Sequence, residues 1–147
     1  MNNKRITINK ATPKAFDAML VLEEFGKTCS IHPILKELIK IRASILNGCA
    51  YCLDMHTEDA ISLGENARRI YAVSVWHESH LFNEEERTVL RITDEVTKIA
   101  DKGLTDSTYQ KAIELFGESA TAEIIMLIVT INAWNRIAVS TRLIYKP

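Results

Sequence analysis

The sequence has no excess of charge of either sign. Its 18 lysine and arginine residues balance 19 aspartate and glutamate residues, which leaves a net charge of -1 at pH 7. Nucleic acids and anionic membranes attract strongly basic surfaces, so we expect neither as a partner. No apolar segment of the secretory type follows the first five residues. We therefore expect a cytoplasmic protein whose partners are small molecules or other proteins.

Long hydrophobic runs are also missing. The most apolar stretch, residues 124–133, has about half of the ~20 residues that a membrane-spanning helix needs, and polar residues interrupt or flank it. A helix that is apolar almost all round packs inside a protein or at a subunit interface. We expect this stretch to do one of the two.

Cysteine is scarce, with three residues in the chain. Thiols stay mostly reduced in the cytoplasm, where a Cys-x-x-Cys pair is more often catalytic or metal-binding than structural. Cys49 and Cys52 form such a pair. Cys29 has no close cysteine in sequence, and we expect it to be a buried small apolar residue.

The chain lacks internal repeats and low-complexity linkers, and its 147 residues suit one domain that buries a core without disulfides. The alternation of Ile6 and Ile8 is too short to support a sheet. We expect an extended arm over residues 1–12 and a helical domain over residues 13–147.

Apolar residues recur every three or four positions along most of the chain, which predicts an all-α, single-domain bundle of six to eight helices. Proline and capping residues mark the starts of these helices, and glycine marks most of their ends. The expected helices span about residues 13–26, 30–47, 50–63, 66–76, 83–103, 105–116 and 119–144.

The clearest chemical signal lies at the start of the expected helix 50–63. Cys49, Cys52 and His56 follow a helical spacing that places them on one face. Free backbone N–H groups and the positive end of the dipole favour a thiolate in the first turn. His56 can donate a hydrogen bond to the Cys52 sulfur or accept its proton. The pattern predicts a reactive dithiol with its own proton carrier.

Glu37 borders the apolar face of the preceding helix, where a carboxylate commonly keeps its head in water. If it packs under the cysteine helix, burial would raise its pKa and pairing with an imidazolium would lower it. In both cases Glu37 is a candidate proton acceptor.

Two other interpretations of the motif are open. The cysteines can be merely buried small residues, or Cys49, Cys52, His56 and Glu37 can supply four ligands to zinc. Three of these ligands share eight residues of one helix, which is cramped for a tetrahedral site. We therefore expect no metal and no other cofactor.

Polar residues on the apolar last helix, Asn132, Asn135 and Arg136, are expected to satisfy buried carbonyls or carboxylates rather than to act in the site. Residues 76–79 could line a pocket, but Trp76 is expected in the core or at an interface.

The spacing of Glu37, eleven intervening residues, Cys49-x-x-Cys52 and then His56 resembles the alkylhydroperoxidase AhpD-like core of the carboxymuconolactone decarboxylase family. Residues 38–44, 76–87 and 135–137 are similar to that family as well. The resemblance extends from about residue 13 onward.

The resemblance implies an all-helical fold, a homo-oligomer that is often a trimer or hexamer, and peroxidase activity dependent on both cysteines. It makes Cys52 the peroxidatic cysteine, Cys49 the resolving cysteine, and Glu37 with His56 a proton relay. Decarboxylases of the family lack the cysteine pair, so its presence argues against that activity. The helix dipole alone favours Cys49 as the nucleophile, whereas contact with His56 favours Cys52.

Three functional hypotheses follow. The first is a thiol-dependent hydroperoxide reductase that takes a small hydroperoxide and is reduced by an external dithiol or protein reductant. The second is a disulfide oxidoreductase or redox relay acting on protein thiols. The third is an oligomeric redox sensor whose disulfide changes its assembly without turnover.

Overall fold

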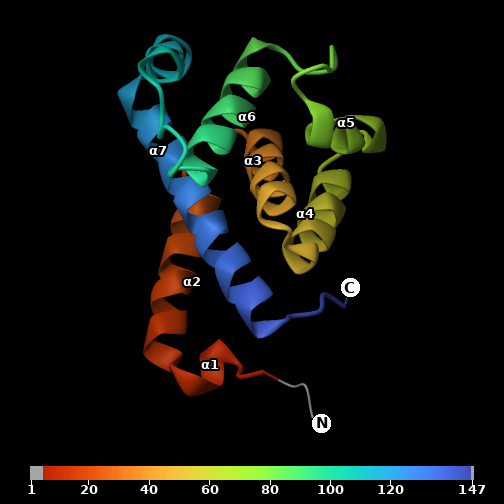
Figure 1. Ribbon diagram of the computed structural model, residues 1–147, viewed down its shortest axis with the longest axis vertical. Coiled ribbons are helices and arrows are strands. Elements are labelled where there is room, and N and C mark those ends of the chain that lie inside the picture. Colours follow the sequence, from red (N-terminus) through yellow and green to blue (C-terminus); the bar gives the residue numbers. More distant parts are fainter. Residues whose placement is uncertain (1–4, 147) are drawn as a thin grey trace.

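A computed structural model describes residues 5–146, and helices make up nearly all of its regular structure (Figure 1). No strand occurs among these described residues. The elements are α1 (Ile8–Ala11), α2 (Pro13–Thr28), α3 (Pro33–Asn47), α4 (Ala50–Ser62), α5 (Ala67–Ala72), the 3₁₀ helix η1 (Val73–Val75), α6 (Glu84–Thr97) and α7 (Asp106–Thr141). The predicted all-α bundle is confirmed.

Helix α3 is the central element of the fold. It packs against α4, α6 and α7, and it lies between α4 on one side and α6 and α7 on the other (Figure 1). Its apolar residues serve two core clusters. Ile39 joins the cluster around Ile128 of α7, while Leu38 joins the cluster around Trp76. Burial on both sides fixes the position of α3, and therefore of Glu37, which it carries.

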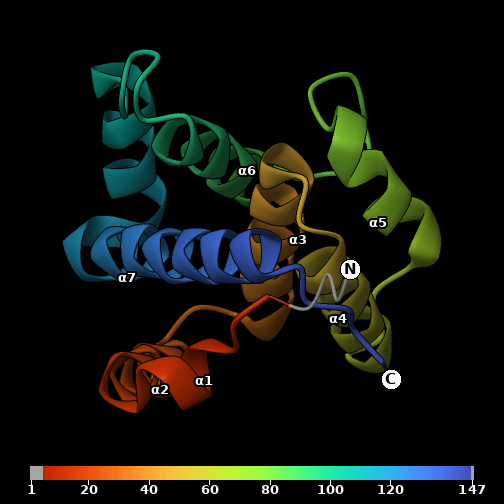
Figure 2. The same ribbon diagram turned by 60° about the horizontal axis from the view of Figure 1, so that its bottom comes forward.

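A left-handed glycine connects α3 to the cysteine helix. Gly48 ends α3 with φ 63° and ψ 34°, a conformation that costs other residues about 1 kcal/mol or more. The Cys49 N–H then donates to the Ser44 carbonyl oxygen at 2.9 Å. This turn reverses the chain and places the start of α4 beside the end of α3, as Figure 2 shows from a second side.

Several predicted boundaries are wrong. Residues 8–11 of the expected extended arm form the helix α1, while residues 1–4 lie outside the described part of the chain. Gly26 does not end α2, which continues to Thr28. The expected fourth helix is divided into α5 and η1, and the fifth ends at Thr97 rather than near residue 103. The separation of an arm from a domain at residue 12 remains a prediction.

The two expected C-terminal helices form α7, which a glycine interrupts. Gly117 has φ 75° and ψ 175°, which is not helical, so the chain bends there and helical structure resumes. The second segment ends at Thr141 instead of residue 144. In the described part of the chain, no helix combines the length and the apolar character that crossing a membrane requires.

Candidate active site

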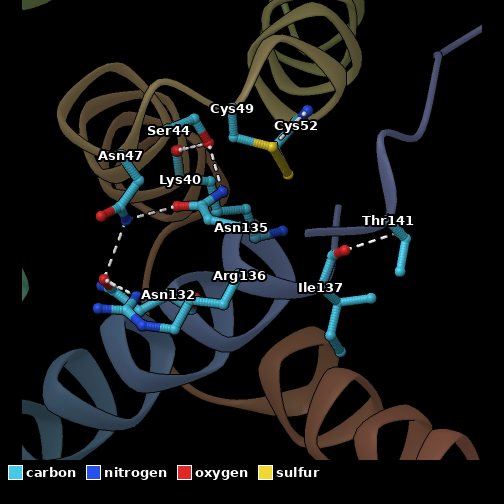
Figure 3. Close-up of a disulfide and its surroundings, with 10 residues drawn as sticks. All are labelled: Lys40, Ser44, Asn47, Cys49, Cys52, Asn132, Asn135, Arg136, Ile137 and Thr141. Atoms are coloured by element: carbon cyan, nitrogen blue, oxygen red, sulfur yellow. Dashed lines mark hydrogen bonds between the residues drawn. A yellow bond between two sulfur atoms is a disulfide. The ribbon is translucent and has the colours of Figure 1, made fainter. Parts of the chain in front are cut away.

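The cysteine pair lies at the N-terminal end of α4 as a disulfide, with the two Cα atoms 5.4 Å apart (Figure 3). Cys49 is the N-cap residue, one position before the helix, and its Sγ accepts a hydrogen bond from the Cys52 backbone N–H at 3.3 Å. Cys52 lies in the first turn. Both side chains are buried, with 1% and 2% of their surface exposed. The structure therefore brings the two predicted cysteines together.

A cavity of about 420 Å³ lies beside Cys52. Its walls come from α1, α2, α4, the end of α7 and the residues that follow α7. Cys52 and His56 line it, and Cys49 is absent from its described lining. A ligand in the cavity would therefore meet Cys52 rather than Cys49. The described lining residues are Thr7, Ile8, Asn9, Phe16, Glu23, Tyr51, Cys52, Met55, His56, Trp134, Ile137, Ala138, Thr141 and Leu143.

Glu37 packs under the cysteine helix and contacts His56. The His56 Nδ1 atom lies 2.9 Å from the Glu37 Oε2 atom, and both side chains are buried. Burial alone would raise the pKa of Glu37. The hydrogen bond and charge of His56, together with the charge of Lys40, outweigh burial and hold the pKa of Glu37 below its usual value of 4.5. Glu37 is therefore a buried carboxylate, and not the solvated border residue that its position on α3 also allowed.

The Glu37 contact also orients the imidazole. Because a carboxylate only accepts hydrogen bonds, the Nδ1 atom of His56 carries the proton and Nε2 is left for other partners. Among the described residues, no hydrogen bond joins His56 to the Cys52 sulfur in this disulfide form. Cys52 and His56 line the same cavity. A direct contact between their side chains stays a prediction.

Three charged residues near this pair were missed by the sequence analysis. Lys40 Nζ lies 3.0 Å from Glu37 Oε1, and Asp59 Oδ2 lies 3.6 Å from His56 Nδ1. Each is three positions along a helix from its partner, a spacing that could have identified it. Glu23 lies 4.0 Å from Lys40 and comes from α2, so no local spacing indicates it.

The group best placed to hold a metal differs from the one considered in sequence. Glu37, His56 and Asp59 offer ligand atoms within 4.8 Å of one another. Cys49 and Cys52 do not join them, because their sulfurs are bonded to each other. Lys40 already provides Glu37 with a positive partner at 3.0 Å. This charge makes the group a poorer cation site than its ligand atoms alone suggest.

The polar residues of the last helix brace the turn that carries Cys49 (Figure 3). The Asn47 side-chain amide donates to the oxygens of Asn132 and Asn135, at 3.0 and 2.9 Å. Asn135 donates in turn to the Ser44 hydroxyl at 3.1 Å. The carbonyls and carboxylates expected as partners of these residues are therefore replaced, in these contacts, by side-chain amides and a hydroxyl. Arg136 does donate to the Asn132 carbonyl oxygen, at 3.0 Å.

Trp76 lies in the core, as expected, and away from the cavity. Its side chain is fully buried, and its Nε1–H donates to Asp94 at 3.2 Å. Asp94 also pairs with Arg42 from α3. None of residues 76–79 belongs to the described lining of the cavity. Cys29 is only half-buried, but it packs against the core cluster that contains Ile128.

Comparisons with known proteins assign the chain to a family. The sequence profile of the carboxymuconolactone decarboxylase family matches residues 10–95. The uncharacterized protein YdfG of Bacillus subtilis is 36% identical over 138 residues, which cover 94% of each chain.

Solved structures agree with this match. A protein of unknown function from Agrobacterium tumefaciens, with a suggested role as the antioxidant defence protein AhpD, superposes with a TM-score of 0.94 at 39% identity, covering 98% of this chain and 99% of that chain. An uncharacterized peroxidase-related protein with an alkylhydroperoxidase AhpD core, from Ralstonia eutropha, has a TM-score of 0.80 at 17% identity, covering 94% and 74%. The chain belongs to the carboxymuconolactone decarboxylase family and has the AhpD-like core fold.

Proposed function

We propose that the protein is a thiol-dependent hydroperoxide reductase. The observation that carries this proposal is the position of Cys52. This residue lines a cavity and is paired with Cys49 as a disulfide, and His56, which contacts Glu37, lines the same cavity. Membership of a family with an AhpD-like core supports the same chemistry.

In the proposed reaction the Cys52 thiolate attacks the terminal oxygen of a hydroperoxide. The O–O bond breaks, Cys52 becomes a sulfenic acid, and the other oxygen leaves as an alkoxide that takes up a proton to give an alcohol. The Cys49 sulfur then attacks the Cys52 sulfur, the S–O bond breaks, and water leaves as the disulfide forms. An external dithiol returns both cysteines to thiols by exchange and is itself oxidised to a disulfide.

His56 and Glu37 are the proposed proton relay. His56 would take the Cys52 proton through Nε2, the nitrogen that Glu37 leaves unoccupied, and return it to the departing alkoxide. Glu37, ionised and bonded to Nδ1, would stabilise the imidazolium that forms between these two transfers. In this scheme Glu37 is a positioning residue, because it acts through His56.

Burial argues against the alternative of direct exchange with protein thiols. Sulfur-to-sulfur attack requires the partner thiol to reach Cys49 or Cys52, of which 1% and 2% are exposed. A small hydroperoxide, or a small dithiol such as the one that closes the proposed cycle, can instead approach Cys52 through the cavity. The expected homo-oligomer remains a proposal that light scattering after size-exclusion chromatography will test.

The test is hydroperoxide consumption with dithiothreitol as the dithiol. We expect Cys52→Ser to abolish consumption, because serine supplies no thiolate. Cys29→Ser is the matched control: it removes the one cysteine outside the pair and should leave the rate unchanged within about twofold. Normal turnover by Cys52→Ser would end the assignment, and disulfide exchange without peroxide consumption would favour the redox relay.

A further inference from the structure

The cavity beside Cys52 has an unusual distribution of charge. Among its described lining residues there is no lysine or arginine, but there is one acid, Glu23. Lysine and arginine are the side chains that normally pair with the carboxylate of a ligand. The lining therefore offers an anionic ligand a negative charge where it would need a positive one.

Another residue of the cavity wall, Trp134, holds the Glu23 side chain in position. Its Oε2 atom accepts a hydrogen bond from Trp134 Nε1 at 2.9 Å, and both residues line the cavity. About 30% of its side chain is exposed. The carboxylate is thus held in place and is only partly shielded by the surrounding protein.

The nearest cation compensates Glu23 weakly. Lys40 Nζ lies 4.0 Å from Glu23 Oε1 but only 3.0 Å from Glu37 Oε1. Lys40 is also absent from the described lining of this cavity. Any positive charge on His56 is likewise taken up, because its Nδ1 atom faces Glu37 at 2.9 Å and Asp59 at 3.6 Å.

The rest of the lining is mainly apolar, with Phe16, Tyr51, Met55, Trp134 and Ile137 among its residues. Apolar walls favour ligands that bury hydrocarbon and disfavour those that must leave a charged group without water. The volume of about 420 Å³ lies in the range of pockets that hold small organic molecules. Composition and charge thus favour the same kind of ligand.

We propose that this cavity takes neutral, apolar organic hydroperoxides and discriminates against hydroperoxides that carry a carboxylate, with Glu23 as the specificity-determining residue. This inference rests on the proposed function, because it takes the ligand of the cavity to be the hydroperoxide substrate of that reaction. The discrimination itself depends only on what the cavity binds.

The experiment measures binding without chemistry. The probes are 2-phenyl-2-propanol, the alcohol produced from cumene hydroperoxide, and the same alcohol with a carboxylate at the para position of the ring. Each is titrated by calorimetry at pH 7 into the disulfide form of the full chain. We expect the carboxylated alcohol to bind about tenfold more weakly than the neutral one.

Two variants separate the charge of Glu23 from other effects. Glu23→Gln removes the charge and keeps an oxygen that can accept the Trp134 hydrogen bond, so the ratio of the two affinities should fall to about threefold or less. Glu24→Gln is the matched control, because Glu24 pairs with Lys27 at the surface and does not belong to the described lining. Its ratio should stay at the wild-type value.

Equal binding of the two alcohols, or binding of neither, would overturn the inference. A preference for the neutral alcohol that Glu23→Gln leaves unchanged, or that Glu24→Gln reduces as strongly, would also overturn it. Failure of the proposed function has a different signature. In that case the neutral alcohol still binds preferentially, while the reduced protein consumes no hydroperoxide.

Discussion

Replacement of Glu37 by glutamine tests whether a buried, ionised carboxylate supports the site. The new amide would keep the shape of the side chain, but His56 and Lys40 donate to different oxygens of Glu37 and glutamine has only one. One hydrogen bond is therefore lost and the other is kept to a neutral oxygen. A hydrogen bond to a charged group contributes ~1.5–3 kcal/mol, about 1 kcal/mol more than a neutral one. We therefore expect the free energy of unfolding to fall by ~3 kcal/mol at pH 7, and the melting temperature by roughly 6–12 °C.

The pH dependence of this loss gives the sharper test. The pKa of Glu37 is lowered in the folded protein from its usual value of 4.5, so its charge stabilises the fold above that pH, and the stabilisation is lost as the pH falls through the folded pKa. The difference between wild type and Glu37→Gln should therefore be constant between pH 7 and about pH 5. It should shrink at lower pH.

The assay is urea unfolding of the disulfide form, followed by circular dichroism, across this pH range. Glu24→Gln, at an exposed position beside Lys27, should change stability by less than ~0.5 kcal/mol at every pH. A Glu37→Gln protein as stable as wild type at pH 7 would refute the reasoning. So would a difference that persists undiminished down to the acid transition.

Three further predictions use other parts of the structure. Cys49→Ser should stop the reaction after its first step, so one equivalent of hydroperoxide leaves a sulfenic acid on Cys52 that dimedone labels and mass spectrometry detects. Gly48→Ala should destabilise the protein by about 1 kcal/mol in urea unfolding, because alanine is strained at φ 63° even though no atom lies within 4 Å of the added carbon; an unchanged midpoint would contradict this. Asn135→Ala should cost ~1–3 kcal/mol in the same assay, since it removes two hydrogen bonds, with the Asn47 amide and the Ser44 hydroxyl, although each of these groups keeps one other partner; a loss below ~0.5 kcal/mol would show that the network contributes little.

Local patterns predicted the starts of the helices better than their ends. Asn83 and Glu86 form the expected capping box at the start of α6, and Gly48 separates α3 from α4. Gly26 does not end α2, for a physical reason. It is helical, and a Cβ atom at this position would lie 3.2 Å from the Leu127 side chain. This glycine therefore permits close packing of α2 on α7 and does not end a helix.

In the site, too, local spacing predicted some contacts, and only the packing of the helices could give the others. Cys49, Cys52 and His56 share one stretch of helix, so their spacing alone indicated that they lie near one another. The contact between Glu37 and His56 joins residues that are 19 positions apart in the sequence. It forms only because α3 and α4 pack together and bury both side chains. Glu23 reaches the cavity from α2 and could not be found before α2, α4 and α7 were placed together. Local rules therefore found the candidate nucleophile, and tertiary packing defined what surrounds it.

The central claim is that Cys52 and Cys49 undergo a peroxide-driven cycle. The most direct measurement counts free thiols in the reduced protein before and after one equivalent of cumene hydroperoxide, with peptide mapping of any disulfide. We expect rapid loss of two thiols, a Cys49–Cys52 link and an unmodified Cys29. Thiols that survive the peroxide, or a disulfide that involves Cys29, would contradict the claim.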